Sequence, residues 1–383
     1  MEELLVLYFQ PTLGPAHLAR IRALDRQPGI RCRGVQLASR ERSRDYVPAS
    51  EDAEFFRTLT YGVYEDQPRS RVIRAGWRQI IRSQPGAIIV DRPADPVQSI
   101  LAALAHWNGA LTLTRWASIE TDFERKPWRE FLKGFLYRRF DGYLVTGCRA
   151  RAYLASFDVA PQRIFECGNP SDDGFSRFAA RETGSSRQES FLYVGRFLPF
   201  KNLSRLLAAF AQYRACGGTW SLDLVGFGDE EPQLRAAGTA IPGVVFRGHL
   251  QLDALARAYS RAGCLILPSV SEPWGLVVNE AMSCGTPVVV SRRCGCFPEL
   301  VEEGGNGFGI DPFDVEQIAE TLRRFASLSE EAREAMARRS RDIARAHSVD
   351  AWAVEVAQAI RKLDAERAVG RTPNDGRVPP TVR

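Results

Sequence analysis

Two glutamates in one apolar stretch have the spacing to hold a ligand between them. Glu272 lies in a polar turn after the apolar run 265–267, and Glu280 follows, after seven intervening residues, inside a helix predicted over 275–284. The N-terminus of such a helix offers free N–H groups and the positive end of the helix dipole, which suit a phosphate. Carboxylates on either side could hold hydroxyl groups. The ligand with this chemistry is a sugar joined to a nucleoside diphosphate.

The same two glutamates also have an ordinary structural explanation. One of them could cap the helix while the other is a solvated helix residue, and an isolated pair of this spacing does not separate the two interpretations. The surrounding pattern is strand, turn, helix, strand. Gly285 and Pro287 end the helix, and residues 288–290 begin the next buried strand.

A family resemblance favours the ligand-binding interpretation. The segment SEPWGLVVNEAMSCGTPVVVS resembles the E-x7-E segment of glycosyltransferase family 4, which comprises retaining sugar-nucleotide enzymes of the GT-B fold. The segment FLYVGR, followed by Lys201 and a helix from Asn202, is similar to the family's strand-G-R-x4-K segment, which carries two cations to the diphosphate. The similarity is clear from about residue 189 to 310 and faint over the N-terminal half.

The resemblance implies an α/β protein of the GT-B fold, in which two Rossmann-like parallel-sheet domains face each other across a cleft. Arg196 and Lys201 would neutralise the diphosphate leaving group, and Glu280 would hold the ribose hydroxyls. Glu272 and the backbone from Trp274 to Val277 would position the donor sugar and its phosphate, so Arg196, Lys201 and Glu272 are the expected catalytic residues. The expected donor-binding residues are Gly195, Arg196, Lys201, His249, Leu250, Glu272, Trp274, Gly275, Leu276, Val277 and Glu280.

The N-terminal half offers weaker candidates for an acceptor site. Gly14 and His17 follow the first predicted strand, 4–9, at a turn where ligands of open parallel sheets bind. The alternative is a tight turn with His17 at a helix N-terminus. Glu120 and Asp122 follow the predicted strand 110–113, and one of them could contact an acceptor hydroxyl, although acidic residues near a helix start are commonly caps.

Alternating strands and helices in both halves predict two parallel sheets covered by helices. The expected organisation is an N-terminal acceptor domain over 1–173, a polar linker over 174–190, and a donor-binding domain over 191–347. A helix over 348–365 should pack back toward the first domain, and a disordered tail should cover 366–383.

Composition limits the class of protein. The 383 residues are 45% hydrophobic and 25% charged, as in a soluble globular protein of two domains. No apolar run is long enough to span a bilayer and the acidic N-terminus does not resemble a signal peptide, so we expect a cytoplasmic protein. The eight cysteines and four histidines show no metal-ligand spacing, which predicts no bound metal, and a formal charge of +5 is too small to indicate nucleic-acid binding.

Two basic amphipathic segments raise the question of membrane contact. Arginines recur at spacings of three and four between Arg71 and Arg82, beside apolar residues, and a second basic and aromatic segment covers 128–139. Either segment could lie on an anionic membrane surface, at the inner face of the membrane. The more ordinary alternatives are a solvated helix face for the first and a helix packed on the sheet for the second.

The sequence therefore predicts a retaining hexosyltransferase that needs no cofactor and uses a nucleoside-diphosphate sugar as co-substrate. The acceptor would be a carbohydrate, a lipid-linked glycan or a small molecule, and the pathway would make cell-surface or exopolysaccharide glycans. Alternatives are a GT-B epimerase or phosphorylase, or a sugar-nucleotide sensor without chemistry. The residues do not name the base, the sugar, the acceptor or the oligomeric state.

Overall fold

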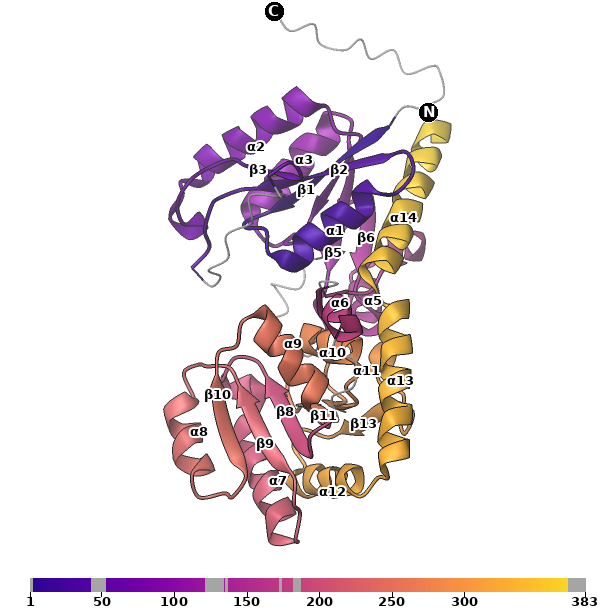
Figure 1. Cartoon of the computed structure of the whole chain (residues 1–383). Coiled ribbons are helices and arrows are strands. Elements are labelled where there is room, and N and C mark those ends of the chain that lie inside the picture. Colours follow the sequence, from indigo (N-terminus) through magenta and orange to yellow (C-terminus); the bar gives the residue numbers. More distant parts are fainter. Residues whose placement is uncertain are drawn as a thin grey trace, which may run out of the picture.

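The chain folds into two α/β domains stacked end to end, as the computed structural model shows (Figure 1). The structure describes residues 3–42, 53–120, 134, 137–171, 174–181 and 187–370. Each domain contains one fully parallel sheet within these ranges. The expected α/β class with two parallel-sheet domains is confirmed.

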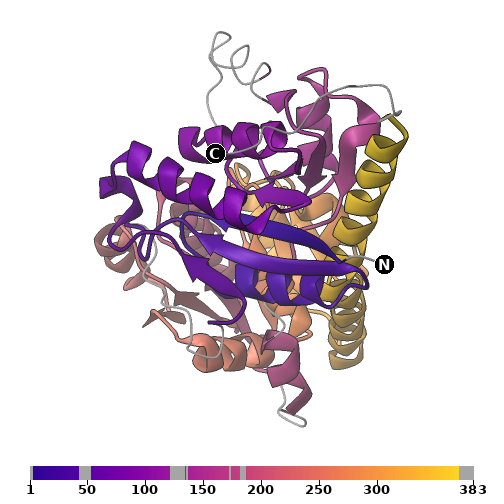
Figure 2. The ribbon, with the colours of Figure 1, turned by 90° about the horizontal axis from the view of Figure 1, so that it is seen from above.

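The N-terminal sheet has the strand order β3-β2-β1-β4-β5-β6-β7. Its apolar strands are buried on both faces, which explains their nearly continuous hydrophobic sequence. Helices α1 and α14 cover one face, and α2 and α3 cover the other (Figure 2). The strands are β1 (Leu4–Gln10), β2 (Ile30–Gln36), β3 (Phe56–Thr58), β4 (Ala87–Val90), β5 (Leu111–Trp116), β6 (Gly142–Val145) and β7 (Ile164–Glu166). The helices are α1 (Pro15–Asp25), η2 (Tyr64–Asp66), α2 (Arg69–Ser83), α3 (Pro96–Trp107), α5 (Cys148–Ala155) and η3 (Pro161–Arg163).

The C-terminal sheet has the order β10-β9-β8-β11-β12-β13. One continuous core cluster joins its strands to the helices around them. The strands are β8 (Ser190–Val194), β9 (Ser221–Val225), β10 (Val244–Gly248), β11 (Cys264–Leu267), β12 (Val288–Ser291) and β13 (Gly307–Ile310). The helices are α6 (Gly174–Arg181), η4 (Pro199–Lys201), α7 (Leu203–Ala215), α8 (Glu231–Gly238), α9 (Leu252–Arg261), α10 (Leu276–Ser283), α11 (Phe297–Leu300), α12 (Val315–Ala326) and α13 (Glu330–Ala346).

The last helix, α14 (Val349–Gly370), returns from the C-terminal domain to the N-terminal one. It packs against α1 and β5 to β7, and buries Trp352, Val356 and Ile360 there. The helix continues through residues 366–370, where the sequence predicts the start of a tail, while residues 371–383 lie outside the described ranges.

The predicted linker over 174–190 differs from what the structure shows. Residues 174–181 form helix α6, which packs against α9 and α10 and buries Phe175 in the C-terminal core. Phe178 and Ala179 pack against the same core, so the i, i+3, i+4 spacing of these apolar side chains gives the helix a buried face. The chain therefore crosses between the domains before α6, near Asn169 to Ser171.

In both sheets the strand order reverses at one pair of neighbouring strands. These pairs are β1 and β4 in the first sheet and β8 and β11 in the second. Ligands of open parallel sheets bind outside the carboxyl ends of the strands at such a switch point. The loops after these four strands are therefore where a ligand site is expected, and they contain most of the residues singled out in the sequence.

Candidate active site

The loop after β8 presents the two predicted cations. Arg196 is exposed, and the Tyr193 hydroxyl donates a 2.9 Å hydrogen bond to its carbonyl oxygen. Gly195 has φ of +152°, and a Cβ there would meet the Tyr193 hydroxyl at 2.8 Å, so this turn suits glycine. The backbone after Arg196 leads through η4 to Lys201. The loop thus carries one cation to the surface and one into the site.

Lys201 reaches the loop that follows β11, the strand beside β8. Its ammonium group forms an ion pair with Glu272, and both side chains are largely buried, at 14% and 15% exposure. The sequence assigned these residues to neighbouring parts of one ligand. The structure brings them together at the switch point, although they are 71 positions apart in the chain.

Asn202 fixes this arrangement and was missed in the sequence. It adopts a left-handed conformation with φ of +64°, which asparagine tolerates better than most residues. Its buried amide donates to the carbonyl oxygens of Pro268 and Pro312, at 3.1 and 2.6 Å. These bonds tie the lysine loop to the glutamate loop. The only feature of the sequence that pointed to Asn202 was the helix predicted to begin there.

Glu280 lies in α10, and a tyrosine from α9 holds its carboxylate. The Tyr259 hydroxyl donates a 2.8 Å hydrogen bond to Glu280 Oε2, and Tyr259 itself is fully buried. Burial, with the nearby Glu280 charge, holds the pKa of Tyr259 well above its usual value, so this hydroxyl remains a donor. No sequence signal connected Tyr259 to the site, because the contact joins separate helices.

The start of α10 places backbone rather than side chains at the site. Gly275 precedes the helix with φ of +104°, a conformation that favours glycine. The Trp274 indole is 2% exposed and donates to Asn279 Oδ1 at 2.7 Å, so it belongs to the core. Leu276 and Val277 form the first turn, whose N–H groups have no intrahelical acceptor. The predicted donor contacts of residues 274–277 would therefore be made by main-chain N–H groups and not by side chains.

Two of the predicted donor-binding residues lie directly after β10. His249 is exposed, and Leu250 is partly buried against the core. The His249 ring meets the ring of Phe227 edge to face at 5.7 Å, and Phe227 is 54% exposed. Phe227 was not singled out in the sequence, because the glycine turn around it is a weak signal. These rings provide an exposed aromatic surface beside the glycine turn after β9.

Gly226 and Gly228 let the β8 and β9 loops approach each other. A Cβ on Gly226 would lie 1.8 Å from the carbonyl oxygen of Gly195, and one on Gly228 would lie 2.4 Å from that of Phe197. The Phe197 N–H donates to the Phe227 carbonyl at 2.7 Å. Any side chain at these glycines would separate the loops and displace the arginine turn.

A buried cluster of charged and polar side chains lies at the switch point of the N-terminal sheet. Asp91, directly after β4, accepts hydrogen bonds from Arg115 at 2.6 Å and from the Tyr8 hydroxyl at 2.9 Å. His17 Nε2 lies 3.5 Å from the same carboxylate. Asn169 Oδ1 accepts from both Arg115 and Arg20, at 2.8 and 2.6 Å. Of this cluster only His17 was a sequence candidate, although Asp91 directly follows a predicted strand.

His17 is held as a neutral, positioning side chain. Its Nδ1 accepts the Gly14 N–H at 3.0 Å, so the proton of the neutral ring lies on Nε2, facing Asp91. Burial lowers the pKa of His17 to about 4, despite the opposing effect of Asp91. His17 is therefore at the helix start and its ring faces the switch point, while its predicted approach to a ligand stays a prediction.

This histidine should make stability depend on pH. Below pH 6.5 the unfolded chain takes up a proton at His17, whereas the folded state stays neutral down to about pH 4. The stabilisation that neutral His17 contributes to the folded state is therefore fully present above pH 6.5. It is lost as the pH drops toward 4, by at most about 3 kcal/mol. His17→Gln, which keeps an acceptor and a donor, should flatten the dependence of the thermal midpoint over this range. Equal pH slopes in the two proteins would contradict this account.

The remaining acceptor candidates are not brought into this cluster by any contact that the structure records. Glu120 is exposed in the loop after β5. Asp122 lies outside the described residues, as does most of the basic segment 128–139. Within the described ranges, no group of three or more potential ligand side chains could hold a metal ion. No described helix is long and apolar enough to cross a bilayer.

The domains touch beside the site through Glu299. Its carboxylate accepts the Cys148 N–H at 2.5 Å, at the first turn of α5 in the other domain. A Cβ on Gly147 would lie 2.5 Å from Glu299 Oε1 and 2.9 Å from the Trp274 ring, so glycine permits this approach. The Arg149 guanidinium also lies 3.5 Å from the Cys294 carbonyl oxygen. The turn after β12 and helix α11 thus meet the N-terminal domain directly.

Comparison with known proteins finds a family similarity in the second half of the chain. Residues 176–343 match the family model described as glycosyl transferases group 1. A sulfoquinovosyl transferase of Arabidopsis thaliana is 32% identical over 210 residues, which make up 52% of this chain and 40% of that protein. A D-inositol 3-phosphate glycosyltransferase of Nocardioides is 29% identical over 246 residues, or 58% of this chain and 53% of that protein. The chain therefore spans about half the length of these curated relatives.

Solved structures resemble the whole chain. Sucrose-phosphate synthase from Thermosynechococcus elongatus superposes with a TM-score of 0.72 at 21% identity, over 95% of this chain and 100% of that one. The Anabaena protein HepE, in complex with UDP and glucose, gives a TM-score of 0.71 at 18% identity, over 94% and 100%. These likenesses concern the fold, which is GT-B, as expected.

Proposed function

We propose that this chain, whose residues 176–343 form a group 1 glycosyl transferase domain, is a retaining hexosyltransferase that uses a nucleoside-diphosphate sugar. The observation that carries the proposal is the pairing of Lys201 with Glu272 at the switch point of the second sheet, beside the exposed Arg196. A cation for the diphosphate and a carboxylate for sugar hydroxyls then lie side by side. The Anabaena neighbour, which holds UDP and glucose, supports this ligand class.

The chemistry is the departure of a nucleoside diphosphate from the anomeric carbon. Negative charge grows on the leaving phosphate in the transition state, and preorganised cations stabilise that charge more than they stabilise the ground state. Arg196 and Lys201 supply the cations, and the first-turn amides of α10 supply neutral donors. Glu272 orients the sugar. Glu280, held by Tyr259, accepts hydrogen bonds from the ribose hydroxyls.

The acceptor binds on the N-terminal side, at the loops after β1 and β5. Gly14 and His17 supply the first loop and Glu120 the second, while the cluster around Asp91 keeps the first loop rigid. His17 is neutral at physiological pH but its Nδ1 is already engaged by Gly14. It therefore positions the loop, and the leaving phosphate takes the acceptor proton. The acceptor is a carbohydrate, a lipid-linked glycan or a small molecule of cell-surface or exopolysaccharide synthesis.

The enzyme should work without a divalent metal or other cofactor. Arg196 and Lys201 neutralise the charge that Mg²⁺ or Mn²⁺ would otherwise neutralise. Turnover measured in excess chelator should equal turnover in untreated enzyme. Activity that is lost on chelation and restored by Mg²⁺ or Mn²⁺ would refute this mechanism, because the two cations would then be insufficient.

We also propose a peripheral membrane contact through α2 and α3, at the cytoplasmic face of the membrane. The rings of Trp77 and Trp107 stack at 6.5 Å, and Trp107 is 81% exposed, beside Ile81 and Ile100 at 41% and 43%. Apolar side chains with an adjacent cationic stripe favour an anionic bilayer surface. The exposed arginines of α2 are Arg69, Arg71, Arg74, Arg78 and Arg82.

Vesicle flotation tests this surface. Wild-type protein should float with vesicles containing anionic lipid, and Trp107→Ala should reduce the bound fraction several-fold. Tyr61→Ala is the matched control, because Tyr61 is also 81% exposed but lies outside both helices. If the two variants bind alike, α2 and α3 form an ordinary solvated surface.

The donor itself is found by screening nucleotide sugars for thermal stabilisation. A ligand that binds only the folded state raises apparent stability by mass action, so the cognate donor should give a concentration-dependent shift. Released nucleoside diphosphate, measured with candidate acceptors, then separates an enzyme from a sensor. If no nucleotide sugar shifts the midpoint of folded wild-type protein, the proposed function is wrong.

A further inference from the structure

A cavity of about 330 Å³ lies at the hinge, beside helix α10. It is bounded by the first interdomain crossing, by α6 and α10, and by the junction of α13 with α14. Both segments that cross between the domains therefore contribute to its wall. Its residues are Pro170, Ser171, Ser176, Ala179, Asn279, Ser283, Arg341, Ala344, Arg345, His347, Ser348 and Val349.

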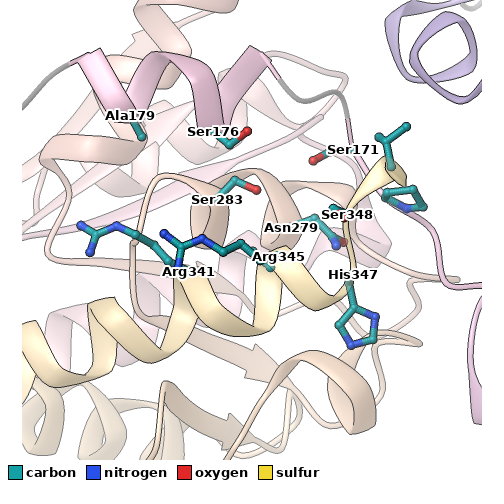
Figure 3. A pocket seen from close by; sticks show the side chains of 12 residues that line it. Ser171, Ser176, Ala179, Asn279, Ser283, Arg341, Arg345, His347 and Ser348 are labelled. Carbon is teal, nitrogen blue, oxygen red and sulfur yellow. The ribbon is translucent and has the colours of Figure 1, made fainter. Parts of the chain in front are cut away.

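The lining is rich in hydrogen-bond donors. Figure 3 shows the hydroxyl groups of Ser171, Ser176 and Ser283 turned toward the space between α6 and α10. Ser171 is 7% exposed and Ser283 is partly buried, and neither hydroxyl forms a hydrogen bond with another described residue. A hydroxyl that lines a cavity and has no protein partner retains its capacity to bind a polar ligand.

The lining is also cationic. Arg341 and Arg345 extend from successive turns of α13 along the cavity (Figure 3), and the described lining includes no carboxylate. Arg341 has no ion-pair partner among the described residues, whereas Arg345 has only an exposed pair with Asp342. The charge of Arg341 also adds to burial in lowering the pKa of the neighbouring Arg187 to about 10. The local potential is therefore positive.

The start of α14 points its donors at the same space. Ser348 caps this helix, accepting the Ala351 N–H at 3.3 Å, and Val349 is its first residue. Asp350 turns outward, where it pairs with Arg26 at 2.7 Å. The first-turn amides and the helix dipole of a long helix favour an anion at this end. The guanidinium groups of Arg341 and Arg345 thus lie toward one end of this cavity and the start of α14 toward the other, with Ser176 and Ser283 between them (Figure 3).

We propose that this hinge cavity binds a small phosphate-bearing anion. Phosphate offers several acceptor oxygens around one centre and a double negative charge, which matches two guanidinium groups together with surrounding hydroxyl donors. The cavity is larger than a free phosphate ion, so a phosphate monoester of a small polyol fits the hydroxyl-lined remainder. The bound anion contacts both interdomain crossings and so links the two domains at the hinge.

Binding is tested by calorimetry with glycerol phosphate and inorganic phosphate, in the presence of saturating UDP to occupy the donor site. Wild-type protein should bind glycerol phosphate more tightly than inorganic phosphate. Arg341→Ala should weaken both by about 10-fold or more, the typical effect of removing a charged hydrogen-bond partner. Arg338→Ala is the matched control, because Arg338 lies on the same helix and pairs with Glu334 on the surface. Its affinities should equal those of wild type.

Two further variants test the same cavity if Arg341→Ala folds poorly. Arg345→Ala removes a largely exposed side chain, at 76% exposure, and should fold normally while weakening binding several-fold. Ser283→Leu fills the cavity and should abolish binding. Wild-type protein that binds neither probe at millimolar concentration overturns the proposal, and so does a folded Arg345→Ala or Ser283→Leu variant with unchanged affinity. A donor-site failure would appear instead as loss of UDP binding.

Discussion

Arg196→Ala and Lys201→Ala are each expected to lower turnover by about 100-fold or more, because both cations act on charge that develops in the transition state. The Arg196 variant is the cleaner test. Arg196 is exposed and its side chain forms no hydrogen bond or ion pair with a described residue, so its removal should leave the fold unchanged. Turnover is measured at saturating donor, where loss of ground-state binding no longer contributes.

The Lys201 variant needs a stability control, because Lys201 has a structural partner. Its removal leaves Glu272, which is 15% exposed, without its cation, and an unpaired buried charge is destabilising. Thermal midpoints therefore accompany the kinetics. Arg235→Ala, which removes an exposed cation paired with Glu231 on α8, should keep wild-type turnover. Folded Arg196 and Lys201 variants that both turn over within a few-fold of wild type would contradict the assignment.

Glu280→Ala and Glu272→Ala should affect the binding of the free nucleoside diphosphate differently. Glu280 is assigned to the ribose, so its loss should weaken UDP binding by about 10- to 100-fold, as expected for hydrogen bonds to a charged group. Glu272 is assigned to the sugar, and its carboxylate neutralises Lys201. Its removal should therefore leave the affinity for UDP unchanged or raise it, while weakening binding of the sugar nucleotide.

Calorimetry with UDP and with the cognate nucleotide sugar separates these roles. Tyr259→Phe gives an intermediate case, because it removes the hydroxyl that holds Glu280 but keeps the carboxylate itself. We expect a several-fold loss of UDP affinity from that variant. An equal loss of UDP affinity in both glutamate variants would mean that the carboxylates contact the same part of the ligand.

In each domain, polar side chains from two neighbouring loops meet at the switch point of the sheet. The sequence pointed to such a pair only in the C-terminal domain. In the second domain the loops after β8 and β11 carry Lys201 and Glu272, and in the first the loops after β1 and β4 carry His17 and Asp91. Both pairs sit at a switch point. The resemblance marked the donor residues because their spacing is specific, whereas a lone histidine and a lone aspartate have no such pattern.

The sequence by itself determined what depends on local patterning. Buried strands such as Ala87–Val90 read as short apolar runs, and their alternation with amphipathic segments requires parallel sheets, whatever the details of packing. The helix at Glu280 and the turn at Gly275 are likewise local, since glycine before an apolar helical run predicts a helix start. The failure at 174–190 also has a local cause. Its polar and small residues concealed the three apolar positions that make α6 a packed helix.

Only the tertiary structure decided which of these residues meet. Lys201 pairs with Glu272 and Tyr259 with Glu280 because the sheet places β8 beside β11 and α9 beside α10, and no spacing within one segment encodes those neighbours. The pKa of His17, the hinge cavity and the Glu299 contact with α5 likewise depend on burial or on crossing segments. Burial and through-space charge are properties of the packed chain, since both depend on atoms that are distant in sequence.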